Sequence, residues 1–173
     1  VNHRLKESLK KKCTELKKMI DIVPMTEKHI DDVAELDQIC FHIPWTREDF
    51  EKEIKENNMA IYFVAVDNDK AIGYAGMWHV VNEGHITNVA VLPEYRRQGI
   101  GDMLMEAVDK KADELEIEGV TLEVRISNYG AQKLYTKHGY KPEGFRKKYY
   151  TDTNEDAVIM WKYYDRNNDS TET

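Results

Sequence analysis

The sequence contains little cysteine and no long apolar run. Two cysteines, Cys13 and Cys40, are too few for a disulfide framework, so we expect free thiols, with Cys40 buried along a helix. No stretch approaches the ~20 consecutive apolar residues that a membrane helix needs. The first residues also lack the apolar core of a secretory signal. We therefore expect a cytoplasmic protein without membrane attachment.

The chain also lacks an overall excess of basic charge. Its 173 residues are enough for one domain and carry a net charge of −7. Residues 1–20 hold seven basic and two acidic side chains, which leaves 18 basic and 30 acidic ones for the rest. We expect a basic amphipathic helix or extension over 1–20, a domain over 21–164 and a disordered polar tail over 165–173. The acidic domain argues against direct nucleic-acid binding and favours a cationic substrate.

The pattern of residues 85–108 predicts a buried strand, a tight glycine turn and a helix. Pro93 ends the strand because it cannot donate to a neighbour, and Gly99 and Gly101 allow a ligand to approach the main chain. The helix begins at the same turn, so its free N–H groups and positive dipole end favour a phosphate there. The Gly-Lys-Ser/Thr ending of a Walker loop is absent, and Leu104 stands where the dinucleotide fingerprint needs a third glycine.

Further helices and strands surround this stretch. The patterns predict helices that begin near Thr26 and Thr46, a short helix within 127–139, and strands over 22–25, 60–66, 71–80, 120–126, 144–151 and 156–164. Because a helix connects strands 85–91 and 120–126, we expect these two to be parallel and the others antiparallel. Gly119 is expected to end the connecting helix in the left-handed conformation. The fold class is therefore α/β (α+β).

The glycine turn carries the pattern Arg96-x-x-Gly99-x-Gly101. This pattern resembles the acetyl-coenzyme A signature of the GNAT-type N-acetyltransferases. An acetyl transfer from a thioester to an amine requires one group that accepts a proton from the amine and another that protonates the departing thiolate. Candidates for both roles lie outside the turn.

Glu123 is the candidate proton acceptor, because it lies in a strand that should be central, where burying a carboxylate without a purpose is costly. Pairing with Arg125 or exposure to solvent would also explain it. Tyr135 is the candidate proton donor, although packing and an ordinary hydrogen bond would explain a tyrosine there as well. Glu83 and His85, at the start of the preceding strand, are alternative bases.

Longer motifs make the resemblance more specific. NVAV at 88–91, PEYRRQGIG at 93–101, LEVRISN at 122–128 and LY at 134–135 resemble the N-terminal protein acetyltransferases, and IPWT at 43–46, RKKYY at 146–150 and NEDAVIM at 154–160 resemble the bacterial RimI type. The resemblance covers about residues 21–162. It implies a single N-acetyltransferase domain with a mixed, mostly antiparallel sheet, a splayed parallel strand pair and flanking helices. It also implies acetyl-coenzyme A as co-substrate and no metal.

The same resemblance assigns roles to individual residues. Glu123 takes the place of the family's proton acceptor and Tyr135 that of its proton donor. The acetyl-coenzyme A positions are Val89, Ala90, Val91, Arg97, Gln98, Gly99, Ile100, Gly101, Asp102 and Asn128. Asn128 could instead simply cap the following helix. Asp102 departs from the family pattern, and we expect its carboxylate to point away from the phosphates, which would repel it.

The acceptor implied by the resemblance is the N-terminal alanine of a small-subunit ribosomal protein. Pro44, Trp45, Tyr149 and Tyr150 would line a slot for its extended peptide. Three alternatives stay open: a broader range of protein N-termini, as in the archaeal enzymes that His85-Ile86 resembles; a lysine or small-molecule amine; or a non-catalytic coenzyme A-binding regulatory module. We expect a monomer or weak dimer.

Overall fold

The computed structural model describes residues 6–7 and 20–165. The basic extension predicted for 1–20 and the tail predicted for 165–173 fall almost entirely outside these residues, so the domain boundaries stay predictions. In the described part of the chain, no helix is long and apolar enough to span a bilayer.

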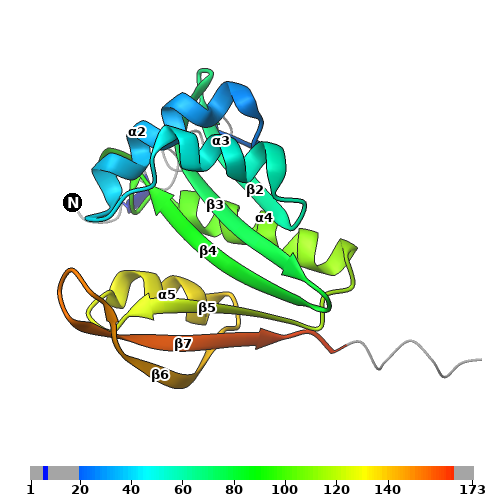
Figure 1. The fold of residues 1–173 in the computed structure, drawn as a ribbon, viewed down its shortest axis with the longest axis vertical. Helices are drawn as coiled ribbons and strands as arrows, with labels where there is room; N and C mark the ends of the chain where they lie inside the picture. The colour runs from blue at the N-terminus through cyan, green and yellow to red at the C-terminus, as the bar shows by residue number, and fades with distance from the viewer. Residues whose placement is uncertain (1–5, 8–19, 166–173) are drawn as a thin grey trace, which may run out of the picture.

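One mixed sheet organises the described residues (Figure 1). Its strand order is β1-β2-β3-β4-β5-β7-β6, and only β4 and β5 are paired in parallel. The strands are β1 (Asp21–Pro24), β2 (Ala60–Asp67), β3 (Lys70–Val80), β4 (Glu83–Val91), β5 (Gly119–Arg125), β6 (Lys141–Tyr150) and β7 (Glu155–Tyr163). The predicted fold class and the parallel pair are confirmed.

Helices cover both faces of the β1–β4 half of the sheet. They are α2 (Ile30–Cys40), α3 (Arg47–Glu56) and α4 (Ile100–Glu114), with single 3-10 turns at Glu27–His29 and Pro93–Tyr95. Helix α5 (Tyr129–Lys137) lies beside β5 in the other half (Figure 1). In β3 the Tyr74 hydroxyl donates to Asp37 of α2 at 2.5 Å, whereas a Cβ on the preceding Gly73 would lie 3.4 Å from Leu104 of α4. Because neighbouring side chains of a strand alternate, α2 and α4 pack on opposite faces (Figure 1).

Two helices begin at the caps that the sequence predicts. Thr46 Oγ1 accepts from the Asp49 backbone N–H at 3.2 Å, and the Asp49 carboxylate accepts from the Thr46 N–H at 2.8 Å, which is a capping box at the start of α3. The Asn128 side chain accepts from the Ala131 N–H at 3.1 Å and caps α5. These local bonds fix where each helix starts.

The parallel strands β4 and β5 stay together only at one end. They pair over Glu83–His85 and Gly119–Thr121 and then diverge, as the strands of Figure 1 show. Residue 87 has no partner in the ladder, because Gly76 of β3 pairs with Asn88 while Met77 pairs with Ile86. Such a bulge bends its strand, and it lies where the divergence starts. The predicted splay is thus confirmed.

The prediction for Gly119 is wrong. Helix α4 ends at Glu114, and the left-handed residue after it is Glu116, with φ 54°. Gly119 is the first residue of β5, and a Cβ there would lie 3.1 Å from the Tyr163 ring and 3.3 Å from the Trp161 ring. A glycine at this position lets β5 pack closely against the rings of β7, which the local sequence does not reveal.

Candidate active site

A cavity of about 730 Å³ opens between the diverging end of β4, the start of α4 and the length of α5. It is lined by residues 89–91, Arg97, residues 99–102 and Asn128, which are the positions predicted to hold acetyl-coenzyme A. Gln98 was predicted with them but is not among the lining residues, and its side-chain amide donates to the Glu94 carbonyl at 2.9 Å. The structure therefore brings nine of the ten predicted positions together at one cavity.

The turn before α4 borders this cavity. Arg97 and Gly99 both have left-handed conformations, with φ of 61° and 85°, and Gly99 is the N-cap residue of α4. Successive N–H groups in such a turn and the free N–H groups of a helix start favour an anion. Packing also favours a glycine at position 101. A Cβ there would lie 3.1 Å from Leu134, so the glycine lets α4 and α5 approach each other.

Four basic side chains also line the cavity, namely Arg96, Arg97, Lys133 and Lys137. They suit the phosphates of an elongated anionic ligand. The site prediction missed the two lysines, although their spacing of four residues puts them on one face of the short helix that Asn128 caps. Within the described residues, no group of three or more His, Cys, Asp or Glu side chains could hold a metal ion.

Asp102 is directed toward α5. Its carboxylate accepts hydrogen bonds from Lys137 Nζ at 2.7 Å and from His138 Nε2 at 3.0 Å. Burial by itself raises the pKa of Asp102, but these hydrogen bonds outweigh burial and hold that pKa below its usual range. The negative charge at the start of α4 is therefore compensated by Lys137 and His138, while the position of Asp102 relative to the phosphates stays a prediction.

Tyr135 lies in the wall of the cavity and is 7% exposed. Burial raises the pKa of its hydroxyl, and the nearby Tyr150 adds to the shift. The hydroxyl therefore keeps its proton at neutral pH, as a proton donor requires.

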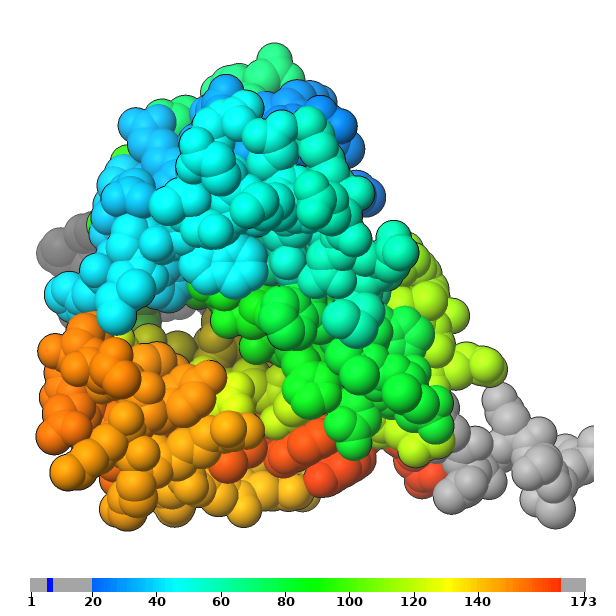
Figure 2. Space-filling view, in the orientation of Figure 1, coloured from blue at the N-terminus to red at the C-terminus, as the bar shows by residue number. Residues whose placement is uncertain are grey.

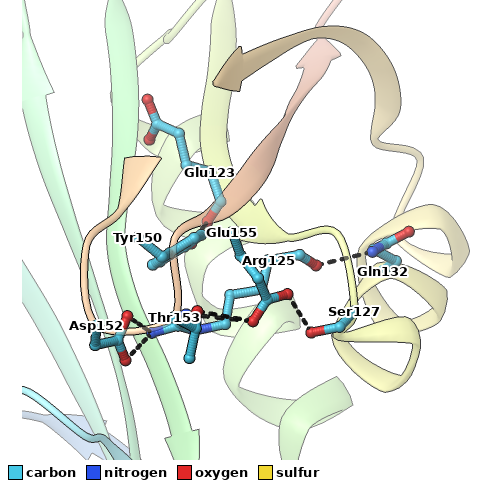
Figure 3. Close-up of polar contacts among 8 residues, drawn as sticks. All are labelled: Glu123, Arg125, Ser127, Gln132, Tyr150, Asp152, Thr153 and Glu155. Carbon is cyan, nitrogen blue, oxygen red and sulfur yellow. Dashed lines mark hydrogen bonds and ion pairs between the residues drawn. The ribbon is translucent and has the colours of Figure 1, made fainter. Parts of the chain in front are cut away.

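Glu123 lies on the other face of the sheet and does not line this cavity. Its side chain is 23% exposed and forms an ion pair with Arg146 of β6, with Nε and Oε1 3.0 Å apart. Figure 3 shows it directed away from Arg125, which instead binds Asp152 at 2.6 and 2.8 Å. The alternative that pairs Glu123 with Arg125 is wrong, because Arg125 is engaged by the β6–β7 hairpin.

That hairpin carries Tyr149 and Tyr150 to the Glu123 side of the gap. The Tyr150 hydroxyl donates to the main-chain carbonyl of Glu123 at 3.3 Å, and the Arg125 guanidinium lies 4.0 Å from the centre of the Tyr150 ring. Tyr149 packs edge-on against Tyr150, with ring centres 5.1 Å apart, and stays largely exposed. Both tyrosines thus border the face on which Glu123 lies.

Trp45 and Pro44 belong to the loop between α2 and α3, on the same side of the sheet as these tyrosines. The backbone N–H of Trp45 donates to the carboxylate of buried Asp37 at 2.7 Å. The Trp45 ring packs on the Phe50 ring, with centres 5.4 Å apart. Trp45 also borders a second cavity of about 490 Å³ along α3. Figure 2 shows an opening between this part of the molecule and the β6–β7 hairpin.

The alternative bases Glu83 and His85 lie where β4 and β5 still pair. His85 Nε2 is 3.3 Å from the Glu83 carboxylate, and both side chains are about half exposed. His85 is paired with Thr121, so Glu123, two residues further, points to the same face as His85.

A model of the acetyltransferase (GNAT) family matches residues 30–140. The chain belongs to this family. This acetyltransferase is 43% identical to a putative ribosomal protein bS18-alanine N-acetyltransferase of Bacillus subtilis, over 79% of this chain and 91% of that protein. It is 34% identical to an N-alpha-acetyltransferase of Saccharolobus solfataricus, over 76% of this chain and 85% of that protein.

A solved structure has the same fold. The ribosomal-protein-S18-alanine N-acetyltransferase of Escherichia coli superposes with a TM-score of 0.80 and 27% identity, covering 90% of this acetyltransferase and all of that chain. The expected family and enzyme class are confirmed. The roles of individual residues stay predictions.

Proposed function

We propose that this acetyltransferase transfers an acetyl group from acetyl-coenzyme A to the N-terminal α-amine of a small-subunit ribosomal protein that begins with alanine. One observation carries the proposal. The gap between β4 and β5 has the Tyr135 cavity on one face and Glu123 on the other. A donor and an acceptor that enter from opposite faces would therefore meet at the gap.

Acetyl-coenzyme A supplies an activated acetyl group when it is bound. The cavity suits it because main-chain N–H groups of residues 97–102 and the four basic side chains favour its phosphates. Val89 and Ala90 line the same cavity where β4 no longer pairs with β5, so their backbone groups can bind an extended chain, and Val91 lines it beside them. The chemistry of the lining therefore fits the co-substrate.

The residues on the two faces of the gap divide the proton chemistry. Glu123 accepts the proton that the α-amine loses as it attacks the thioester carbon, and Arg146 holds the carboxylate in place. The Tyr135 hydroxyl, kept protonated by burial, donates a proton to the thiolate that leaves when the C–S bond breaks. No covalent enzyme intermediate is required.

The bacterial relative named for bS18-alanine favours an N-terminal alanine as the acceptor, and the acidic domain suits a basic ribosomal peptide. Such a reaction would take place in the cytoplasm. A broader range of protein N-termini is the second candidate, because the archaeal relative is named only as an N-alpha-acetyltransferase.

The proposal is tested with acetyl-coenzyme A and a panel of peptides that differ only at the first residue. An N-terminally blocked peptide with a free lysine is included, and release of free thiol is measured. We expect the alanine peptide to have the highest kcat/KM. Preference for the blocked lysine peptide would refute N-terminal acetylation, and preference for another first residue would refute only alanine. Binding of acetyl-coenzyme A without thiol release from any peptide would indicate a regulatory module.

A further inference from the structure

Glu53 of α3 is a buried carboxylate that the proposed chemistry does not use. It is 8% exposed and accepts hydrogen bonds from Trp78 Nε1, from the Tyr62 hydroxyl at 3.1 Å and from Asn57 Nδ2 at 3.1 Å. All three donors are neutral. Among the residues that the structure describes, the carboxylate is therefore held by dipoles and forms no ion pair that would cancel its negative charge.

The hydrogen bonds continue from Glu53 to Thr87 in a defined direction. The Tyr62 hydroxyl lies 3.1 Å from Thr87 Oγ1 as well as from Glu53. An ionised carboxylate can only accept, so Tyr62 donates its single proton to Glu53 and accepts from Thr87. Burial raises the pKa of Tyr62, which keeps that proton in place at neutral pH. The lone pair left on Thr87 Oγ1 can then accept an N–H.

Thr87 lies at the gap and on the face that carries Glu123. It is the unpaired bulge residue of β4, two residues after the last pairing of β4 with β5. His85 and Thr121 are paired and share a face of the sheet, and Thr87 and Glu123 each follow them by two residues. The Thr87 hydroxyl and the Glu123 carboxylate therefore border the gap from its two sides.

Gly76 leaves the space in which Tyr62 and Thr87 meet. A Cβ on Gly76 would lie 2.3 Å from Tyr62 Cε1 and 2.6 Å from Thr87 Oγ1. Such a Cβ would displace both the Tyr62 ring and the Thr87 hydroxyl. The Tyr62 ring stacks on Tyr74, with ring centres 6.3 Å apart. The chain of hydrogen bonds thus depends on a glycine at this position.

We propose that Thr87, oriented by Tyr62 and Glu53, binds the α-ammonium of the acceptor at the gap. The inference rests on the proposed function and names the group that recognises the acceptor's amine; Tyr62 and Glu53 are positioning residues. A hydroxyl backed by an uncancelled carboxylate favours a cation. An acetylated N-terminus has lost its positive charge and keeps a single amide N–H, so the product loses the charge-assisted part of this contact.

The test compares two peptides of one sequence, one with a free N-terminal amine and one already acetylated. Their affinity for the protein saturated with coenzyme A is measured by calorimetry. We expect Thr87→Val to lower the affinity for the free-amine peptide at least about tenfold, as the loss of a hydrogen bond to a charged group does. The affinity of the acetylated peptide should change much less, because its amide N–H is a neutral donor, and that of acetyl-coenzyme A should stay unchanged. Thr87→Ser keeps the hydroxyl and should keep the affinity.

Two further variants separate recognition from stability. Tyr62→Phe should lower mainly the affinity for the free-amine peptide. Combined with Thr87→Val it should lower that affinity little further, because both changes act on one hydrogen bond. Thr121→Val is the matched control, because it removes a buried hydroxyl that donates to the Met160 carbonyl at 3.1 Å. It should lower the melting temperature without changing the affinity for either peptide.

Each remaining outcome counts against the inference. Unchanged free-amine affinity in Thr87→Val and Tyr62→Phe would overturn it, and so would equal weakening of both peptides, which indicates damage to the whole slot. Normal turnover by the unaltered protein would leave the proposed function intact in both cases. An unaltered protein that binds no free-amine peptide would refute both.

Discussion

At the scale of single residues, Glu123 and Tyr135 differ in the face of the sheet on which they lie. Tyr135 lines the cavity that suits acetyl-coenzyme A, whereas Glu123 lies on the opposite face beside Arg146. Changes at the two positions should therefore leave binding of the co-substrate nearly intact while slowing the chemical step.

We expect Glu123→Gln and Tyr135→Phe each to lower kcat by roughly the 10²–10⁴ typical of acid–base catalysis. Both changes preserve shape and remove only the proton-accepting or proton-donating group, so the Kd of acetyl-coenzyme A should change little. Steady-state kinetics and calorimetry measure the two effects.

The controls are Glu143→Gln and Tyr163→Phe. These two side chains form a hydrogen bond of 2.9 Å between β6 and β7, and their kinetics should match the unaltered protein. Normal turnover in both test variants would instead transfer the acid–base roles to Glu83 and His85.

At the scale of elements, α4 and α5 are joined through charged side chains at the edge of the cavity. Asp102 of α4 binds Lys137 and His138, and His138 Nδ1 also lies 3.5 Å from Asp109 of α4. Since α4 starts at the glycine turn and α5 carries Tyr135, these contacts hold the turn and Tyr135 in one arrangement.

The lowered pKa of Asp102 predicts how this connection depends on pH. A carboxyl whose folded-state pKa is depressed contributes stability that is present above its unfolded pKa of about 3.9 and is lost as pH falls through the folded value. Asp102→Asn should therefore lower the melting temperature at pH 7, and the difference from the unaltered protein should shrink as pH falls below about 4.

The control for this prediction is Glu106→Gln, a change at an exposed residue of the same helix. Glu106→Gln should have nearly the same melting temperature as the unaltered protein at pH 7. A difference for Asp102→Asn that persists unchanged at low pH would mean that packing, not the ionised carboxylate, accounts for its effect.

At the scale of the whole molecule, we expect charge to influence how a basic acceptor approaches. The chain carries −7 overall, and residues 21–173 hold 18 basic against 30 acidic side chains. A basic peptide is attracted by this field, and salt screens the attraction with a Debye length of about 10 Å at 0.1 M.

We expect the KM of a basic alanine peptide to rise as ionic strength increases from about 0.05 to 0.5 M, because the screening length falls over that range. The same peptide with its basic residues replaced by glutamine should show a much smaller rise. Initial rates over a salt series measure this, and an equal rise for both peptides would show that the field of the domain does not steer the acceptor.

Features that depend on neighbouring residues were predictable from the sequence alone. The glycine turn at the start of α4 and the caps at Thr46 and Asn128 follow from residue types within a few positions of each other. The LEVR motif and the tyrosine that follows it also indicated Glu123 and Tyr135, through their resemblance to a family.

What only the tertiary structure decided depends on residues distant in sequence. The bulge brings Thr87 to Tyr62, 25 positions away, and Arg125 binds Asp152, 27 positions away, instead of Glu123. Gly119 lets β5 pack closely on β7 and does not end a helix. Strand register and bulges are set by the packing of whole faces, whereas local patterns specify only which residues favour a strand, so these partners appear only when the sheet is assembled.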